Sequence, residues 1–445
     1  MSLTAVVLAA GLGTRMRSPM AKVLHPLLGR PMVRWIVDAL QAQGANVVVV
    51  VHHHEDQVRA ALAHAGVRFA RQSAPRGTGD ALLSALPELP DGGPVLVTAG
   101  DTPLLRPLSV ARLLAEHRGQ ATVAAFEARD PVGYGRMVEG IGIVEEAACT
   151  PRQRLIRLVN SGFYVFDAAY LRRRLPTLQP HPPKDEYWLT DLVDAEAKVV
   201  SGFLEEEFLG VNDRAALAEA RDILSRRINR EWAAEGVEFD SLDHAVVEAS
   251  VRLEPGARVG YGAVLRGTSH VGGDVGEQCV IVDTHIEAGA WVRAGSVCEG
   301  AIVRSGAIVG PLARLRPGAR VESGAHVGNF CEVKNATIHS GAKVNHLSYV
   351  GDANIGAGSN FGAGAITCNY DGVRKHHTEV GAGVFIGTNV ALVAPVSVGD
   401  GAIVGAGSVV GQDVPADAIA VGRPELKIHP GRAEKLRARK RAAKG

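Results

Sequence analysis

The sequence is poor in aromatic residues and carries almost no net charge. Phe, Trp and Tyr make up only 5% of its 445 residues, whereas hydrophobic residues make up 46%. The chain therefore has enough apolar side chains to form a core, and small aliphatic residues must fill most of it. The formal net charge of +1 excludes a general attraction to nucleic acid, so an anionic ligand must be bound by a local cluster of positive side chains.

The cysteines follow no pairing pattern. They number five, stand far apart and include no C-x-x-C, which favours reduced thiols in a cytoplasmic protein over a disulfide framework. The first residues lack the basic segment and apolar run of a signal peptide. No apolar stretch approaches the roughly 18 residues of a membrane span. We expect a soluble cytoplasmic protein with no integral membrane association.

Glycine divides the chain, because most of its 52 glycines lie after residue 245, in the shorter part. Before that point, short aliphatic runs predict buried strands at residues 5–8, 47–51 and 95–98. Apolar residues at helical spacing predict helices over 32–40 and 81–86. This alternation predicts a mainly parallel sheet with helices on both faces and ligands at the carboxyl ends of its strands.

A charged run and then a six-residue rhythm follow. Asp213 precedes a run to Ala234 that predicts a helix, which either connects two domains or packs within the first. From about residue 246 to 420 aliphatic residues recur six apart, a repeat too short for an amphipathic helix and typical of a parallel β-helix, whose coils bury aliphatic side chains by stacking. The rhythm is carried by Leu315, Val321, Val327 and Val333, and later by Val384, Val390 and Val396.

A glycine-rich loop follows the first predicted strand. It reads LAAGLGTRM over residues 8–16, and Lys22 comes soon after. Glycines at this place let backbone N–H groups approach phosphates, and nearby cations neutralise the phosphate charge. The loop lacks the Walker pattern, and Met16 stands where a dinucleotide fingerprint requires a third glycine. It closely resembles the loop of sugar-phosphate nucleotidyltransferases, which transfer a nucleotidyl group onto a sugar 1-phosphate.

Further segments of that family follow in the order it requires. They are Gln72, the GTG at 77–79, Asp101, the GYGR at 133–136, Glu145, the NSG at 160–162, and Asn212. Asp101 alone has a simpler interpretation as a turn residue, and Asn212 alone as a helix cap. As a pair they suit Mg²⁺, which takes few protein ligands and completes its shell with phosphate and water. The ordered set favours the functional interpretation.

The β-helix rhythm is interrupted between Phe330 and Thr378, where a structural coil would have kept it. The residues that interrupt or flank it are Arg316, Lys334, His346, Tyr349, Asn360, the NYDG at 369–372, and Lys375. With the N-terminal segments they resemble, over essentially the whole chain, the bacterial bifunctional N-acetylglucosamine-1-phosphate uridyltransferase and glucosamine-1-phosphate N-acetyltransferase family. The resemblance implies a Rossmann-like α/β nucleotidyltransferase domain followed by a left-handed parallel β-helix of hexapeptide repeats.

The same resemblance implies an enzyme that makes UDP-N-acetylglucosamine. It would acetylate glucosamine 1-phosphate with acetyl-CoA, then transfer uridylyl from UTP to the product and release pyrophosphate. The implied UTP-binding residues are Leu8, Ala9, Ala10, Gly11, Lys22, Gln72, Gly77 and Thr78. The implied pocket for N-acetylglucosamine 1-phosphate and UDP-N-acetylglucosamine contains Gly135, Glu145, Asn160 and Asn212. Arg15 and Lys22 would act in catalysis, and Mg²⁺ would bind Asp101 and Asn212.

For the second site the resemblance implies His346 as the general base, a role that suits a side chain with a near-neutral pKa. The implied residues for glucosamine 1-phosphate are Arg316, Lys334, Tyr349, Asn360 and Lys375. Those for acetyl-CoA are Asn369, Tyr370, Thr388, Ala406 and Arg423. No acyl-enzyme is required, so we interpret Cys331 and Cys368 as bystanders. A homotrimer is expected to form through the β-helix, with acetyl-CoA between subunits.

The expected domains are a nucleotidyltransferase (pyrophosphorylase) domain at 1–229 that includes the start of the linker helix, a linker at 230–245, an acetyltransferase domain at 246–430 and a basic tail at 431–445. The tail is expected to be mobile and solvated, with membrane-surface or nucleic-acid binding as the alternative.

Three positions depart from the commoner family pattern. Ala99 stands where tyrosine is common, Asp80 where histidine is frequent, and Thr388 where serine is common. Thr388 keeps the hydroxyl, whereas Ala99 and Asp80 leave the strictness of the UTP preference open. Two alternatives remain: a monofunctional sugar-1-phosphate nucleotidyltransferase with a structural β-helix, opposed by His346, and a non-enzymatic trimeric scaffold, opposed by Asp101.

Overall fold

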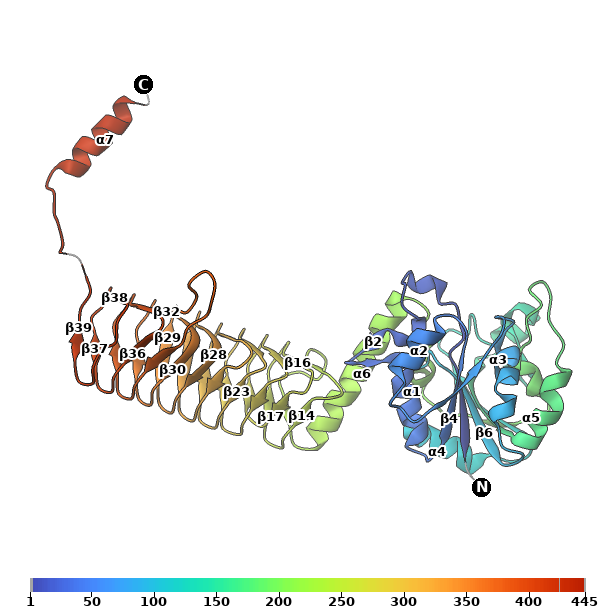
Figure 1. Ribbon diagram of the computed structural model, residues 1–445. Coiled ribbons are helices and arrows are strands. Elements are labelled where there is room, and N and C mark those ends of the chain that lie inside the picture. The colour runs from blue at the N-terminus through green and yellow to red at the C-terminus, as the bar shows by residue number, and fades with distance from the viewer. Residues whose placement is uncertain (1–2, 424, 444–445) are drawn as a thin grey trace. The chain divides into compact units, whose positions relative to one another are not determined.

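The computed structural model describes residues 3–423 and 425–443, and the chain divides into two compact units between Ile228 and Asn229 (Figure 1). The division falls within the helix that the sequence predicts, α6 (Arg214–Ala234). The Asp213 carboxylate caps this helix, since its Oδ1 accepts a 2.9 Å hydrogen bond from the Ala216 N–H.

The first unit is built around a mixed sheet whose strands are mainly parallel. In spatial order they are β11 (Lys198–Val200), β7 (Ala121–Glu127), β10 (Leu158–Asp167), β6 (Pro94–Ala99), β1 (Thr4–Leu8), β4 (Asn46–Val51) and β5 (Arg68–Arg71). Only β10 runs against its neighbours β6 and β7 along this path of described strands. A hairpin of β8 (Arg136–Val138) and β9 (Gly142–Val144) adds to β10, and β2 (Pro26–Leu27) pairs separately with β3 (Arg30–Pro31).

Helices cover both faces of this sheet, as the sequence predicts (Figure 1). Side chains alternate along the strands: Val7 and Val49 belong to the core beside α1 (Met32–Gln41), α2 (Glu55–Ala61) and α4 (Pro107–Glu116). Val6 and Val48 belong to the core beside α3 (Thr78–Ser84) and α5 (Ala168–Arg174). Because both faces are buried, the strands read as continuous aliphatic runs.

The second unit is a parallel β-helix with two sheets of short, stacked strands. The first β-helix sheet contains β12 (Glu238–Phe239), β15 (Arg258–Val259), β18 (Asp274–Val275), β21 (Trp291–Val292), β24 (Ile308–Val309), β27 (His326–Asn329), β29 (Lys343–His346), β31 (Asn360–Phe361), β34 (Phe385–Ile386), β37 (Ile403–Val404) and β39 (Ile419–Ala420).

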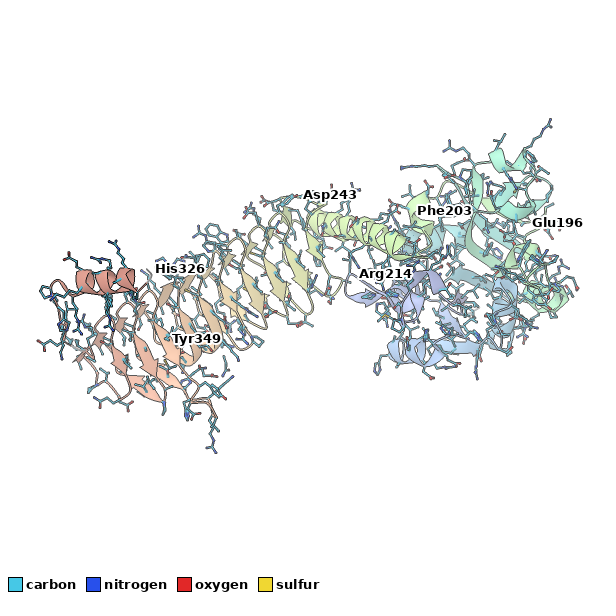
Figure 2. The ribbon with its side chains drawn as sticks, turned by 90° about the horizontal axis from the view of Figure 1, so that it is seen from above. Glu196, Phe203, Arg214, Asp243, His326 and Tyr349 are labelled. Carbon is cyan, nitrogen blue, oxygen red and sulfur yellow. The ribbon has the colours of Figure 1, made fainter. Side chains whose placement is uncertain are left out.

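The second β-helix sheet covers the rest of each coil. It contains β13 (Val246–Val247), β14 (Arg252–Leu253), β16 (Val264–Arg266), β17 (His270–Val271), β19 (Val280–Val282), β20 (His285–Ile286), β22 (Val297–Glu299), β23 (Ile302–Val303), β25 (Arg314–Leu315), β26 (Arg320–Val321), β28 (Glu332–Ile338), β30 (Tyr349–Ile355), β32 (Ile366–Cys368), β33 (Thr378–Val380), β35 (Ala391–Val393), β36 (Val396–Val398) and β38 (Val409–Val410). Side chains project outward from these coils, as Tyr349 shows (Figure 2).

The six-residue rhythm marks the inner face of the coils. Leu315, Val321, Val327 and Val333 are all fully buried, so each coil contributes aliphatic layers to one continuous core. Most neighbouring coils bring together residues 15 to 18 positions apart. At the predicted interruption, Asn354 instead pairs with Glu379, 25 positions later. The extra residues form a loop that leaves the coil after β32 (Figure 1).

The C-terminal basic segment forms a helix, α7 (Arg432–Ala442), in which every residue is exposed. The sequence predicts a mobile, solvated tail here, and full exposure agrees with the solvated part of that prediction. The helix forms because Ala, Arg, Lys, Leu and Glu are strong helix formers. Residues 444–445 of the expected tail lie outside the described residues. Among the described helices, none is both long enough and apolar enough to cross a membrane.

Candidate active sites

The first unit contains a cavity of about 650 Å³ at the carboxyl ends of β1 and β6. The residues expected to bind UTP all line it, namely Leu8, Ala9, Ala10, Gly11, Lys22, Gln72, Gly77 and Thr78. Asp101, Glu145 and Ala99 line the same cavity. Position 99, where tyrosine is common, thus contributes only a methyl group to the wall.

The glycine-rich loop brings Lys22 back to the end of β1. Gly13 has a φ of 63°, and a Cβ at this position would lie 2.8 Å from the Lys22 Cβ, so glycine is required for both conformation and space. Met16 is 1% exposed and anchors the loop in the core. Met16 therefore has a packing role at the position where a dinucleotide fingerprint would require glycine.

Two cations and two oxygen ligands meet at the edge of this cavity. Lys22 Nζ forms an ion pair with Asp101 Oδ2 and lies 3.1 Å from Asn212 Oδ1. Arg15 Nη2 donates a 2.8 Å hydrogen bond to the same Asn212 oxygen. The two segments are joined by a 2.8 Å hydrogen bond from the Val211 N–H to the Asp101 carbonyl. All four predicted side chains are thus in contact.

This donor set fits a small cation. The Asp101 and Asn212 oxygens converge on one ammonium group, so they already face a common point of positive charge. A carboxylate with an amide oxygen suits Mg²⁺, which prefers oxygen ligands and leaves most of its shell to water and phosphate. Among residues 3–423 and 425–443, no group of three or more His, Cys, Asp or Glu side chains forms a larger metal site.

The expected sugar pocket also comes together. The Asn160 N–H donates to the Gly135 carbonyl at 2.9 Å, and a Cβ on Gly135 would lie 3.6 Å from Glu145 Oε2. Thr190 Oγ1 donates a 2.8 Å hydrogen bond to Glu145 Oε1 and orients that carboxylate. Trp188 lines the cavity as well. Neither Thr190 nor Trp188 was predicted from the sequence, because the segment that carries them shows no motif spacing.

In the second unit, positive side chains gather on the second β-helix sheet. Arg316 Nη1 pairs with Glu332 at 2.8 Å, and Arg316 also interacts with Tyr349. The neighbouring Lys375 ammonium, and the Arg316 charge after it, lower the pKa of Lys334. Like charges are therefore held together in the absence of a ligand, an arrangement that suits a bound phosphate.

Asp352 lies under this cluster and was not predicted. It is 9% exposed, and its carboxylate accepts hydrogen bonds from Asn335 Nδ2 at 2.6 Å and Asn369 Nδ2 at 2.5 Å. Burial opposes its ionisation, but the two amide hydrogen bonds and the charges of Lys375 and Lys334 outweigh burial and lower the pKa of Asp352. Asp352 thus connects Lys334 and Lys375 to Asn369.

His346 lies at the corner between β29 and β30. Its Nδ1 is 3.0 Å from Asn329 Oδ1, and the two residues are register partners on neighbouring coils. Since an amide oxygen only accepts, this contact favours a proton on Nδ1 and leaves Nε2 as a free base. Asn329 was also missed, because its link to His346 crosses between coils.

Three of the expected acetyl-CoA residues, Thr388, Ala406 and Arg423, follow the same corner on later coils. The Gly364 N–H donates to the His346 carbonyl at 3.0 Å, Asn389 N–H to Ala363, and Gly407 N–H to Thr388, both at 2.8 Å. Ala406 precedes Gly407, and the Arg423 side chain packs beside Gly407. At about 4.8 Å per coil, the column extends about 19 Å from His346 to Arg423. An extended thioester ligand could follow this column.

Two expected residues stand apart from these groups. Asn360 lies on β31 of the first β-helix sheet, between Lys343 and Phe385, and among the described residues its side chain has no hydrogen bond to the lysine cluster. Tyr370 is on the loop after β32, is 61% exposed and donates to the Gly372 carbonyl at 2.6 Å.

The sequence predicts that the cysteines are bystanders. Within the part of the chain that the structure describes they are free, and Cys331 is buried with its Sγ 3.2 Å from the Val344 carbonyl. Burial raises the pKa of the Cys331 thiol, which keeps it protonated and unreactive.

Comparisons with known proteins agree with this architecture. Residues 5–176 match the model of the MobA-like NTP transferase domain, and residues 377–412 match that of the bacterial transferase hexapeptide, six repeats. The chain is 44% identical to the bifunctional protein GlmU of Sorangium cellulosum, covering 99% of this chain and 98% of that protein. It is 47% identical to the protein of the same name from Thermus thermophilus, covering 95% and 96%.

Among solved structures, a nucleotidyl transferase from Methanothermobacter thermautotroptrophicus matches 51% of this chain and 99% of its own, with 22% identity and a TM-score of 0.38.

Proposed function

This chain belongs to the family of bifunctional GlmU proteins, and we propose that each of its two units carries one activity at the site described above. The protein is a bifunctional transferase that makes UDP-N-acetylglucosamine. It acetylates glucosamine 1-phosphate with acetyl-CoA, and it transfers uridylyl from UTP to N-acetylglucosamine 1-phosphate. The observation that carries the assignment of sites is the contact of Lys22, Arg15, Asp101 and Asn212 at the edge of the cavity of the first unit.

In uridylyl transfer, an oxygen of the sugar phosphate attacks the α-phosphorus of UTP, and pyrophosphate leaves. This reaction needs alignment and charge neutralisation more than covalent help from the protein. Lys22 and Arg15 neutralise the phosphates, while Glu145 and Asn160 orient the sugar. Asp101 and Asn212 would hold Mg²⁺, which supplies further charge neutralisation at the leaving phosphates.

Without a ligand, Lys22 is paired with the same two oxygens. When UTP enters, its phosphates offer Lys22 a second set of partners. We infer that the ammonium moves from Asp101 to phosphate, which frees the oxygen ligands for the metal.

In acetyl transfer, the amine nitrogen of glucosamine 1-phosphate attacks the thioester carbonyl, the carbon–sulfur bond breaks, and CoA leaves. His346 accepts the amine proton at Nε2, since Nδ1 faces Asn329. Lys334, Lys375 and Arg316 bind the sugar phosphate. Acetyl-CoA follows the corner that contains Thr388, Ala406 and Arg423, with Asn369 and Tyr370 near the reacting groups. Asn360 would act from a different face of the coil.

A homotrimer through the β-helix is part of this proposal. It is supported by exposed apolar side chains that stack in register on the first β-helix sheet: Phe385, Ile403 and Ile419 are 51%, 43% and 72% exposed. Such a stripe favours association with another copy. Within one chain, Asn360 and the lysine cluster lie on different β-helix sheets. A neighbouring subunit would therefore be needed to bring the two into one pocket. A cytoplasmic location is proposed on the free cysteines.

Two assays on the full chain test this proposal. Release of CoA with glucosamine 1-phosphate tests the second unit, and formation of UDP-N-acetylglucosamine from UTP and N-acetylglucosamine 1-phosphate tests the first. A chain that forms UDP-N-acetylglucosamine but releases no CoA would be a monofunctional nucleotidyltransferase. A chain with neither would be a scaffold.

A further inference from the structure

Gln72 follows β5 and lines the cavity of the first unit, although only 2% of its surface is exposed. Its side-chain Nε2 donates a 2.8 Å hydrogen bond to Asp80 Oδ2 and a 3.2 Å hydrogen bond to the Gly77 carbonyl. A primary amide has two N–H donors and one oxygen acceptor. Both donors of Gln72 are therefore used inside the protein.

The orientation of this amide follows from its partners. A carbonyl oxygen and an ion-paired carboxylate accept hydrogen bonds and donate none, so the opposite orientation would place the Gln72 oxygen against two other oxygens. Among the described residues, Oε1 of Gln72 has no hydrogen-bond partner. The side chain thus leaves a single acceptor without a protein donor at the cavity wall.

The wall of the same cavity also contains backbone donors from Gly77 and Thr78. The N–H groups of Gly77 and Thr78, at the start of α3, donate to no acceptor within residues 3–423 and 425–443. Gly77 has a φ of 98°, and a Cβ there would lie 2.6 Å from the Tyr187 carbonyl oxygen. Only glycine allows the chain to approach Tyr187 so closely.

Asp80 itself is fixed by an ion pair. Its side chain is 6% exposed, and its Oδ1 lies 2.7 Å from Arg76 Nη2. The Arg76 guanidinium lies over the Tyr187 ring, 5.5 Å from the ring centre. The Tyr187 carbonyl in turn accepts a 2.8 Å hydrogen bond from the Gly79 N–H. Asp80 is therefore held as an acceptor toward Gln72, and it has no proton to offer the Gln72 oxygen.

We propose that Asp80 is a positioning residue that sets nucleotide preference by holding Gln72 with its oxygen toward the base. The cavity wall then presents the Gln72 oxygen as an acceptor, together with the N–H donors of Gly77 and Thr78. This pattern complements a base edge on which a ring N–H adjoins a carbonyl oxygen, as N3–H and O4 do in uracil. Cytosine has the reverse pattern, with a ring nitrogen acceptor beside an amino donor. The inference rests on the proposed uridylyl transfer and names the residue that makes it select UTP over CTP.

The test uses the full chain and the two nucleotides as matched substrates. The ratio of kcat/KM with UTP to kcat/KM with CTP is measured for the wild type and for Asp80→Asn. The amide that this substitution introduces can face Gln72 with either its oxygen or its nitrogen, so Gln72 can turn and accept cytosine. In the turned Gln72, the nitrogen can donate to the cytosine ring nitrogen instead of the oxygen accepting from uracil. We therefore expect the ratio to fall by about tenfold or more.

Two further variants keep the test decisive. Arg76→Gln leaves Asp80 as an acceptor and should keep the wild-type ratio, even if both kcat/KM values fall. Gln72→Met removes the acceptor and should bring the ratio toward one, so it decides the matter if Asp80→Asn does not fold. General damage to the unit lowers both values together and leaves the ratio unchanged.

An unchanged ratio in a folded Asp80→Asn protein would overturn the inference while the proposed function stands. So would a wild type that uses both nucleotides equally well. A wild type that forms no nucleotide sugar from either nucleotide would instead overturn the proposed function.

Discussion

The two sites differ in how their charged groups are balanced before a ligand binds. In the first unit, Lys22 and Arg15 are paired with Asp101 and Asn212. In the β-helix, Lys334 and Lys375 lie beside each other, and this proximity lowers the pKa of Lys334. The first site must exchange internal pairs for ligand contacts, whereas in the second the charges of the neighbouring lysines are only partly balanced by Asp352, which favours binding of a phosphate.

The folds explain this difference. An α/β unit brings several strand ends to one enclosed edge, where buried charges must be paired because burying a single charge is costly. A β-helix coil has only an outer surface for its functional groups, and water screens the repulsion between neighbouring lysines there. The enclosed site is therefore assembled by charge pairing, and the exposed site by backbone register.

The largest expected effect is the loss of the general base in the exposed site. His346→Ala should reduce acetyl transfer by about 10²–10⁴-fold, the usual contribution of a positioned base. The loss should shrink as pH rises, because more substrate then arrives with a neutral amine. CoA release measured against pH checks this.

His339→Ala is the matched control, since it removes another exposed histidine of the same unit. Both variants should keep wild-type uridylyl transfer. A His346→Ala protein that acetylates at the wild-type rate near neutral pH would show that the base is elsewhere.

The next effect concerns the paired site. Asp101→Asn keeps the shape of the side chain but removes its charge, so Lys22 loses its ion pair and the metal loses its carboxylate. Uridylyl transfer should fall by about 10²-fold or more, and acetyl transfer should stay unchanged. Isothermal titration with Mg²⁺ and UTP should show weaker metal binding.

Asp91→Asn removes a carboxylate of the same unit that is fully exposed and should change neither activity. Full uridylyl transfer by Asp101→Asn at limiting Mg²⁺ would exclude Asp101 from the metal site.

These comparisons also indicate what the sequence could predict. The aliphatic runs and the six-residue rhythm specify elements directly, since burial on two faces and stacking of coils each impose a period. The glycine-rich loop and the NYDG insertion predicted the chain segments that meet in each site. The pattern of residues along the chain was sufficient to predict both the elements and these segments.

The missed residues share a different property. Thr190 acts on Glu145 from a distant segment, Asn329 acts on His346 across coils, and Asp352 acts on Asn369 in the same way. No local pattern encodes such contacts. Asn360 is the opposite case. Its place in the sequence suits the second site, but it lies on the first β-helix sheet, away from the lysine cluster on the second.

A smaller effect should follow from a substitution of Asp352, a residue of the exposed site that resembles Asp80 of the enclosed site. Like Asp80, it is a buried carboxylate that fixes the orientation of a carboxamide, here that of Asn369. Its φ of 47° is one that asparagine tolerates, so Asp352→Asn changes charge with little backbone strain. Without the charge, Asn369 can turn, and acetyl transfer should fall by about tenfold.

Uridylyl transfer is the internal control for that variant and should not change. Thermal unfolding of the second unit should also stay close to that of the wild type. An Asp352→Asn protein with full acetyl transfer would show that Asn369 is oriented by its backbone alone.

The smallest and most specific effect is the pH dependence of phosphate binding by the lysine cluster. The Lys375 ammonium, and then Arg316, lower the pKa of Lys334, so Lys334 loses its proton at a lower pH than an isolated lysine does. Phosphate binds the protonated form, and affinity should therefore decline as pH rises through this lowered pKa. Lys375→Ala removes the main cause, so the decline should move to higher pH although affinity near neutral pH is weaker. Calorimetric titration with glucose 1-phosphate, which lacks the amine, isolates this effect from the titration of the substrate.

Lys343→Ala removes an equal charge from the first β-helix sheet and should leave the decline where it is. If the decline stays in place in Lys375→Ala as well, the two lysines do not share one phosphate, and the contrast between a paired and an unpaired site fails.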